Sequence, residues 1–178
     1  VGELEGLLKK ASDDLERRVI ADKGVDAVKE AEAKKKAEDL KRPEEPKEFL
    51  KLADDKAKAG EVPVARQLYN EFLKKWPKDH QAGEAHFGLG ETYFTDDKCR
   101  EALYEYGKVI QEFTGSRSAP QAYLRSADCF KKLKMMPESK LALEELVSKH
   151  PRTDAAKSAK QRLAEIQKES KESKKKGK

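Results

Sequence analysis

Apolar residues recur at helical spacing over most of the chain, and the clearest example runs from residue 85 to residue 114. His86, Leu89, Gly90 and Tyr93 fall at i, i+3, i+4 and i+7, which is one face of a helix with 3.6 residues per turn. After a polar turn comes a second stripe, formed by Ala102, Tyr106, Val109 and Phe113. The pattern predicts two amphipathic helices that form a hairpin. A single hairpin cannot bury both apolar faces, so it needs neighbours.

The same pattern recurs 37 residues upstream and 37 residues downstream. The small residue Ala102 corresponds to Ala65 and Ser139. Two further matched sets are Tyr69, Tyr106 and Leu143, and Phe72, Val109 and Leu146. A fixed period of this length indicates an array of helical hairpins, and the order of residues resembles the tetratricopeptide repeat. We therefore predict an all-α, tetratricopeptide-type solenoid of three repeats. The alternative is a plain antiparallel bundle in which the period is coincidental.

Prolines and composition divide the chain into three parts. Pro43 and Pro46 mark a boundary, because proline removes a backbone donor and disfavours helix in the residue before it. Residues 43–168 are predicted to form the repeat domain, in which Gly60 ends a first helix and residues 134–138 form the third turn. Beyond Pro151, Thr153 or Asp154 can cap one more amphipathic helix, which closes the array. Residues 169–178 are predicted to be a disordered basic tail.

Residues 1–42 have a different pattern. Leu4, Leu8, Ala11 and Leu15 keep a 4–3–4 spacing, which is typical of a short coiled-coil seam. The stretch from 27 to 40 is rich in alanine, glutamate and lysine, which favour helix. We predict one or two charged helices that act as an oligomerisation or spacer segment. The competing interpretation is an atypical helical pair that caps the array.

The net charge of +5 is a property of the C-terminus. Residues 1–46 carry a balance of −2, residues 47–154 carry +1 and residues 155–178 carry +6. A basic tail can contact nucleic acid or anionic lipid, but no aromatic residues interleave with these lysines, and a solvated tail is the simpler interpretation. No apolar run approaches the ~18 residues of a membrane span. The first residue is Val1 rather than methionine, which leaves room for a removed start, signal or anchor.

Candidate chemistry is sparse. Cys99 and Cys129 lack metal-site spacing, and adjacent helices would either bring them within bridging range or bury them as two small thiols. His86 occupies a core position of its repeat, whereas His80 and His150 fall in turns between repeats. The sequence contains no glycine-rich phosphate loop, zinc-protease motif or nucleophile elbow. We therefore expect no catalytic, metal or cofactor site and no enzymatic activity.

A stacked array offers a concave groove lined by the first helix of each repeat. Acids recur there at Asp54, Glu91 and Asp128, with apolar residues beside them. The predicted groove residues are Leu50, Asp54, Phe87, Glu91, Phe94, Leu124, Arg125, Asp128 and Lys131. Such a lining suits a partner peptide or helix with apolar anchors and some positive charge, although the acids could equally form a solvated face. Arg125 lies among these acids and could pair with an acid on the partner. The acids would repel a C-terminal carboxylate, so a chaperone-tail receptor is not expected.

The segments LYNEFLKKWPKD, AHFGLGETYF, YGKVIQEFTGS and LEELVSKHPRTDAAKSAKQRL resemble the C-terminal repeat domain of the bacterial periplasmic family called YbgF or CpoB. The resemblance covers roughly residues 47–168. It implies a short trimerising coiled coil before the repeats and a role beside the Tol–Pal envelope machinery. Residues 1–42 depart from the family, because they lack a sustained heptad seam. Outer-membrane assembly lipoproteins of the BamD-like group share much of the pattern.

Two functional hypotheses follow. The first is an adaptor of the bacterial cell envelope that binds a protein partner in its groove, in the periplasm or at the outer membrane. The second is a structural subunit of an envelope, motility or secretion assembly that uses its N-terminal helices and outer faces. Both predict protein partners, no nucleic acid and no membrane span, with a homo-oligomer formed through residues 1–42 as an option.

Overall fold

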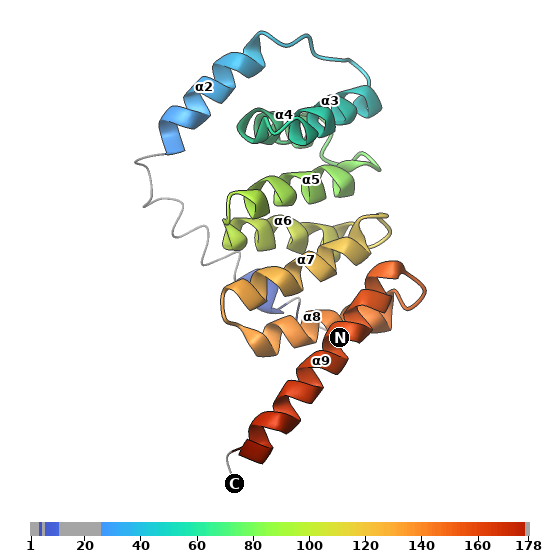
Figure 1. The fold of residues 1–178 in the computed structure, drawn as a ribbon. Helices are drawn as coiled ribbons and strands as arrows, with labels where there is room; N and C mark the ends of the chain where they lie inside the picture. Colours follow the sequence, from blue (N-terminus) through green and yellow to red (C-terminus); the bar gives the residue numbers. More distant parts are fainter. Residues whose placement is uncertain (1–3, 5, 11–25, 177–178) are drawn as a thin grey trace.

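The computed structural model describes residues 4, 6–10 and 26–176, and within these ranges the regular structure is helical, with no strand. Successive helices stack into an elongated array that runs from α2 at the top of Figure 1 to α9 at the bottom, with most helices packed on their neighbours in the chain. The helices are α2 (Asp26–Glu38), α3 (Pro46–Lys58), α4 (Val62–Lys75), α5 (Ala82–Thr95), α6 (Cys99–Glu112), α7 (Ala119–Lys132), α8 (Met136–Lys149) and α9 (Asp154–Lys176).

Three hairpins, α3–α4, α5–α6 and α7–α8, form the body of the array. Their second helices begin at Val62, Cys99 and Met136, which keeps the predicted 37-residue step. Most contacts join a helix to its neighbour along the chain, as stacked hairpins require. The all-α, tetratricopeptide-like solenoid is therefore confirmed, and the plain bundle is excluded.

The turns inside the hairpins share one backbone conformation. Gly60, Asp97 and Lys134 lie 37 residues apart, and all three have a positive φ, of 77°, 59° and 61°. Glycine adopts this left-handed conformation without a steric cost, and the first repeat uses it. The third turn is shorter than predicted, because α8 already begins at Met136 and includes Pro137. Proline is compatible with the first turn of a helix, where its missing N–H has no intrahelical partner.

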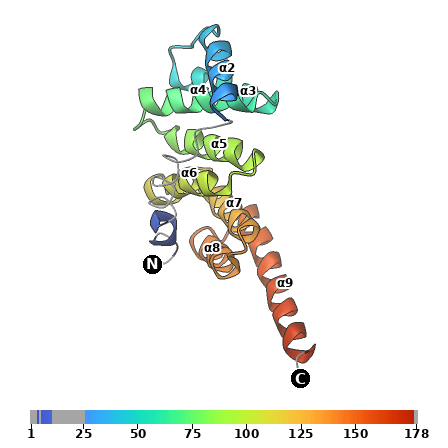
Figure 2. The ribbon, with the colours of Figure 1, turned by 90° about the vertical axis from the view of Figure 1, so that its left-hand side faces the viewer.

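The N-terminal part of the chain packs on the array. Ala33 and Ala37 of α2 are buried against the first hairpin, so α2 covers that end of the solenoid, as the capping interpretation predicted (Figure 1). Leu4 and Leu8 are also buried, in the core of the second and third hairpins, and Figure 2 shows their short helix beside α6. Leu8 lies close to Gly107 of α6, since a Cβ added at residue 107 would be 3.5 Å from Leu8 Cβ, an ordinary van der Waals contact.

The predicted coiled-coil seam is therefore wrong for Leu4 and Leu8, whose apolar faces are covered within the chain. Two leucines four residues apart lie on the same face of a helix, and that face can pack on any apolar helix. Here it packs on helices of the array itself. The other two positions of the predicted seam, Ala11 and Leu15, lie outside the described residues.

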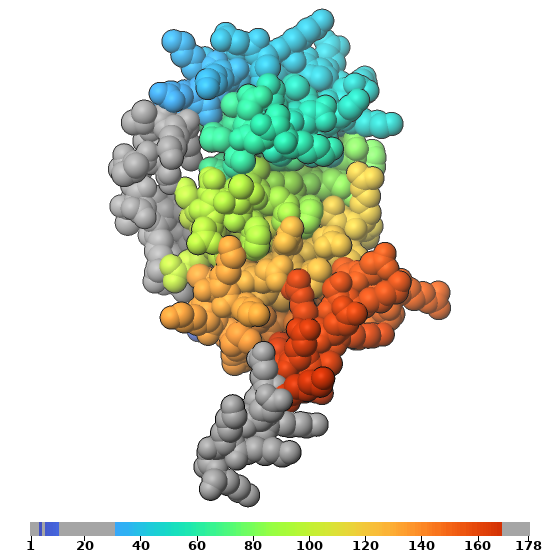
Figure 3. Space-filling model, viewed as in Figure 1, coloured from blue at the N-terminus to red at the C-terminus, as the bar shows by residue number. Residues whose placement is uncertain are grey.

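The last helix, α9, closes the array as predicted. The Thr153 hydroxyl accepts a hydrogen bond from the backbone N–H of Ala156 at 3.2 Å, which caps the helix start. Ala155, Ala156 and Ala159 are buried, and Figure 3 shows α9 lying against α7 and α8. The helix runs on to Lys176, past the predicted start of a disordered tail at residue 169. Lysine and glutamate favour helix, and extending an existing helix needs no new nucleation.

Candidate protein-binding groove

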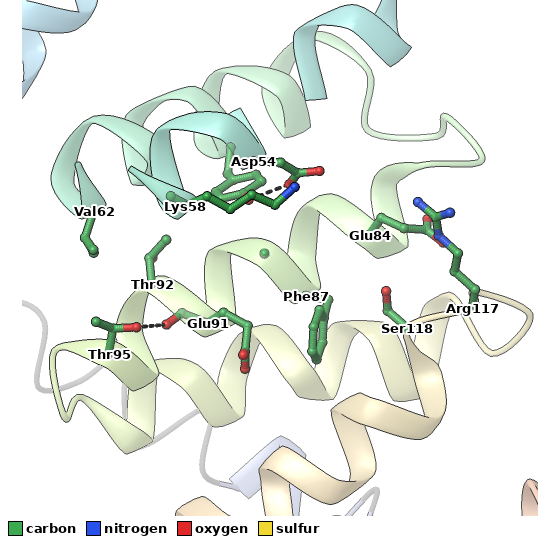
Figure 4. Close-up of a pocket in the computed structure, with 13 residues that line it drawn as sticks. Asp54, Lys58, Val62, Glu84, Phe87, Glu91, Thr92, Thr95, Arg117 and Ser118 are labelled. Carbon is green, nitrogen blue, oxygen red and sulfur yellow. Dashed lines mark hydrogen bonds and ion pairs between the residues drawn. The ribbon is translucent and has the colours of Figure 1, made fainter. Parts of the chain in front are cut away.

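A cavity of about 450 Å³ opens on the inner face of the first two hairpins (Figure 4). Its walls come from α3, α4 and α5, and the loop before α7 closes one side. The lining residues are Asp54, Ala57, Lys58, Val62, Tyr69, Glu84, Phe87, Gly88, Glu91, Thr92, Thr95, Arg117 and Ser118. Three of them, Asp54, Phe87 and Glu91, belong to the groove predicted from the sequence. We call this cavity the groove pocket.

Two of the periodic acids are held by tyrosines of the second helix in their own hairpin. The Tyr69 hydroxyl donates to Asp54 Oδ1 at 2.6 Å, and the Tyr106 hydroxyl donates to Glu91 Oε1 at 2.5 Å. Burial raises the pKa of both phenols, and the neighbouring carboxylates raise it further, so both hydroxyls remain donors. Burial also raises the pKa of Asp54 above its ordinary value. These bonds fix the direction of each carboxylate in the groove.

The groove pocket has an acidic wall and a basic edge. Glu84 joins Asp54 and Glu91 in the lining, and its Oε2 atom is buried without a hydrogen-bond partner among the described residues. The other oxygen, Oε1, accepts from Ser116 Oγ at 3.2 Å and lies 3.5 Å from Nε of Arg117. The Arg117 side chain is 82% exposed, so this contact is easily exchanged for another one.

The groove at the third hairpin is occupied by the chain itself. Asp128, the third periodic acid, pairs with Arg162 of α9 at 2.5 Å. Its own hairpin has Leu143 where the first two have tyrosine, so no hydroxyl holds it. Arg125 pairs with Glu91 at 3.0 Å and with Asp128 at 3.6 Å, so its charge is already balanced within the chain. In this structure Arg125 therefore contacts two acids of its own chain, and its predicted pairing with an acid on a partner stays a prediction.

The remaining predicted groove residues lie elsewhere. Leu50 is 3% exposed and belongs to the core of the first hairpin, and Leu124 packs against the core of the second and third. Phe94 lies beneath Arg125, whose guanidinium carbon is 4.9 Å from the ring centroid. Lys131 is exposed and does not line the groove pocket.

Sequence reasoning missed Glu84, Lys58 and Arg117. A usable signal was present for Glu84, because Glu84, Phe87 and Glu91 fall at i, i+3 and i+7 and share one helix face. The sequence contains no such signal for Arg117, because it lies in the loop between α6 and α7. The folded chain places this loop beside the pocket.

The histidines have structural surroundings. His86 Nδ1 lies 2.7 Å from Glu105 Oε2, and its ring packs against Phe113 at 5.5 Å between centroids. In the ranges 4, 6–10 and 26–176, no group of three or more His, Cys, Asp and Glu side chains is arranged to hold a metal ion. In the same part of the chain, no helix has the length and apolar character to cross a bilayer.

Comparison with known proteins identifies one repeat. The model of the tetratricopeptide repeat family matches residues 121–153, which span α7, α8 and the loop before α9. A search of curated proteins finds no significant match. The tetratricopeptide fold is a non-catalytic fold whose repeats generally mediate protein–protein interaction. Together with three hairpins at a constant step, this match supports a tetratricopeptide-repeat protein.

Proposed function

We propose that this chain is a non-enzymatic adaptor that binds a segment of a partner protein in the groove pocket. The observation that carries the proposal is the composition of that pocket, in which Phe87 offers an apolar surface beside the carboxylates of Asp54, Glu84 and Glu91 (Figure 4). A lysine or arginine of the partner would meet the carboxylates, and a neighbouring apolar side chain would pack on Phe87.

The chain contains an internal example of this contact. Arg162 of α9 reaches Asp128, the periodic acid of the third hairpin, and the two pair at 2.5 Å. Asp54 and Glu91 stand at the same position of the first and second hairpins, and α9 does not reach them. A basic residue of a partner at Asp54 would therefore repeat, over the first hairpin, the contacts that Arg125 makes with Glu91 and Arg162 makes with Asp128.

The setting of this adaptor follows from the resemblance of the repeats to the YbgF or CpoB family. We propose that it acts in the bacterial cell envelope, in the periplasm or at the outer membrane, with a Tol component as the first partner to test. We favour an adaptor over a structural subunit that assembles through its N-terminal helices. Leu4 and Leu8, which such an assembly would use, are buried against the chain's own hairpins.

The test compares two charge changes on α3. Asp54→Asn removes a carboxylate from the groove pocket but keeps an oxygen that can accept from Tyr69. Asp55→Asn makes the same change one residue away, at an exposed position outside the pocket. The probe is a phage-displayed library of random 12-residue peptides selected on the full chain, followed by fluorescence anisotropy with the selected peptides.

We expect selected peptides to combine lysine or arginine with a large apolar residue and to bind more weakly as salt is added. Asp54→Asn should weaken binding about fivefold, the effect of a partly exposed ion pair worth ~1 kcal/mol, and Asp55→Asn should leave it unchanged. Selection of acidic peptides, or equal effects of the two substitutions, would contradict the proposal. Circular dichroism of both variants checks that the helices remain intact.

A further inference from the structure

The two cysteines of the chain meet at the boundary between the second and third hairpins. Cys99 is the first residue of α6, and Cys129 lies on α7. Their side chains belong to one buried cluster, with 4% and 0% of their surfaces exposed. Helices α6 and α7 pack directly against each other, and each thiol is near enough to shift the pKa of the other.

We propose that Cys99 and Cys129 form an intramolecular disulfide bond that locks the second hairpin to the third in an oxidising compartment. The reaction forms one S–S bond from two thiols and releases two protons and two electrons. A disulfide-bearing oxidant, such as oxidised glutathione, takes up both electrons and leaves as two thiols. The first protein thiolate attacks the oxidant to give a mixed disulfide, and the second thiolate displaces the remaining glutathione.

The position of the pair determines when the bond can form. The thiolate is the reacting species, and burial raises the pKa of both thiols, so the folded, reduced chain offers little of it. Oxidant also has no direct access to side chains that are this deeply buried. We therefore expect oxidation to occur while the chain folds or while the hairpins transiently separate. Once formed, the bond is shielded from reductants by the same burial.

The bond would constrain the part of the array that shapes the groove. It closes a loop from residue 99 to residue 129, which contains α6, the loop with Arg117 and most of α7. A second link crosses the same boundary on the surface, where Lys132 Nζ pairs with Asp97 Oδ1 at 2.6 Å. The exposed ion pair contributes little stability, whereas a covalent bond restricts the unfolded chain and holds the two hairpins in one relative orientation.

The test refolds the full chain from urea in a mixture of reduced and oxidised glutathione at pH 8. Remaining thiols are trapped with N-ethylmaleimide in urea before intact-mass measurement. We expect a chain that is 2 Da lighter than the reduced form, carries no maleimide and migrates as a monomer. Peptide mapping should link the two cysteines, and it needs a protease other than trypsin because Lys98 and Arg100 flank Cys99. Cys99→Ala and Cys129→Ala are the controls, and each should retain one reactive thiol.

Stability provides the second measurement. The urea midpoint of the oxidised wild-type chain should exceed that of the reduced chain by about 1 M, and reductant added in urea should abolish the difference. The two alanine variants should show no dependence on oxidant. Two maleimide labels after refolding, or mainly disulfide-linked dimers, would overturn the proposal. If the bond forms but the oxidised chain is no more stable than the reduced one, the proposal that the bond holds the second and third hairpins together is wrong.

Discussion

Gly90 of α5 lies against the ring of Tyr106 of α6, and we predict that alanine at residue 90 destabilises the chain. A Cβ atom added to residue 90 would lie 2.5 Å from Cε1 and 2.8 Å from Cδ1 of Tyr106. The ring cannot easily withdraw, because Tyr106 is fully buried and its hydroxyl donates to Glu91 at 2.5 Å. Either the ring or α5 has to move to accept the methyl group.

Two opposing contributions set the size of the effect. Alanine is favoured over glycine inside a helix by up to about 1 kcal/mol. An extra methyl group in a packed core costs about 1–3 kcal/mol. A separation of 2.5 Å is about 1 Å shorter than an ordinary carbon contact, which puts Gly90→Ala near the upper end of that range. We expect a net destabilisation of about 1–2 kcal/mol, or a fall in Tm of about 2–8 °C for a chain of this size.

Gly107→Ala is the matched control, because it makes the same change in the neighbouring helix α6. Its added Cβ would lie 3.5 Å from the nearest atom, Cβ of Leu8, which is ordinary van der Waals contact. This variant should keep the gain in helix propensity and be about 0.5–1 kcal/mol more stable than the wild type. Urea denaturation followed by circular dichroism at 222 nm compares the midpoints and slopes of the three proteins.

The third hairpin offers a rescue of the clash. It carries Ala127 and Leu143 at the positions of Gly90 and Tyr106, and both side chains are buried there. Combining Gly90→Ala with Tyr106→Leu should therefore cost at least about 1 kcal/mol less than the sum of the single changes. The reasoning fails if Gly90→Ala is as stable as Gly107→Ala, or if the two changes in the second hairpin are additive.

Three further predictions concern the ends and the joints of the array. Arg66→Ala should destabilise the chain by about 2–3 kcal/mol in urea denaturation, because the buried guanidinium donates to Thr92 O at 3.0 Å. Leu8→Ala should cost about 2 kcal/mol and speed hydrogen exchange in α6, since Leu8 is 1% exposed. His150→Gln should lose less stability than the wild type between pH 7.5 and pH 5. Burial and the neighbouring Lys149 lower the pKa of His150, so its neutral form stabilises the fold and protonation removes that contribution.

Each of these predictions has an opposite outcome that would contradict it. The control for Arg66 is Arg66→Lys, which retains the positive charge but not the forked donor geometry of the guanidinium. An unchanged urea midpoint in Arg66→Ala would rule out a structural role for Arg66. An unchanged exchange rate in Leu8→Ala would mean that the N-terminal helix does not cover α6 in solution. Parallel pH profiles of the wild type and His150→Gln would show that another group carries the acid sensitivity.

The body of the fold could be predicted because its residues repeat. Ala102 and its counterparts Ala65 and Ser139 are buried in all three hairpins, so one period specifies helix lengths, turns and core positions together. The N-terminal segment has no such repetition. A four-residue spacing such as that of Leu4 and Leu8 fits a second chain or the same chain equally well, and only the three-dimensional arrangement decides between them.

The groove was predictable in outline and not in detail. Asp128 and Glu91 are equivalent in the sequence, yet Glu91 binds Tyr106 and Arg125 whereas Asp128 binds Arg162. Their partners come from other helices, and the repeat period does not specify which helix passes over which residue. The period therefore relates the three acids to one another, but it does not specify which of them line the groove pocket.

The difference between these acids explains why the groove pocket lies at the first two hairpins. A solenoid has to end, and its last hairpin would otherwise expose an apolar face to water. Here α9 covers that face with Ala156 and Ala159, and the same helix brings Arg162 onto the acid of the third hairpin. The capping helix thus occupies one of three equivalent acidic positions. Arg125 of α7 fills the second position by pairing with Glu91, and the carboxylate of Asp54, oriented by Tyr69, is where a partner would bring the same basic chemistry.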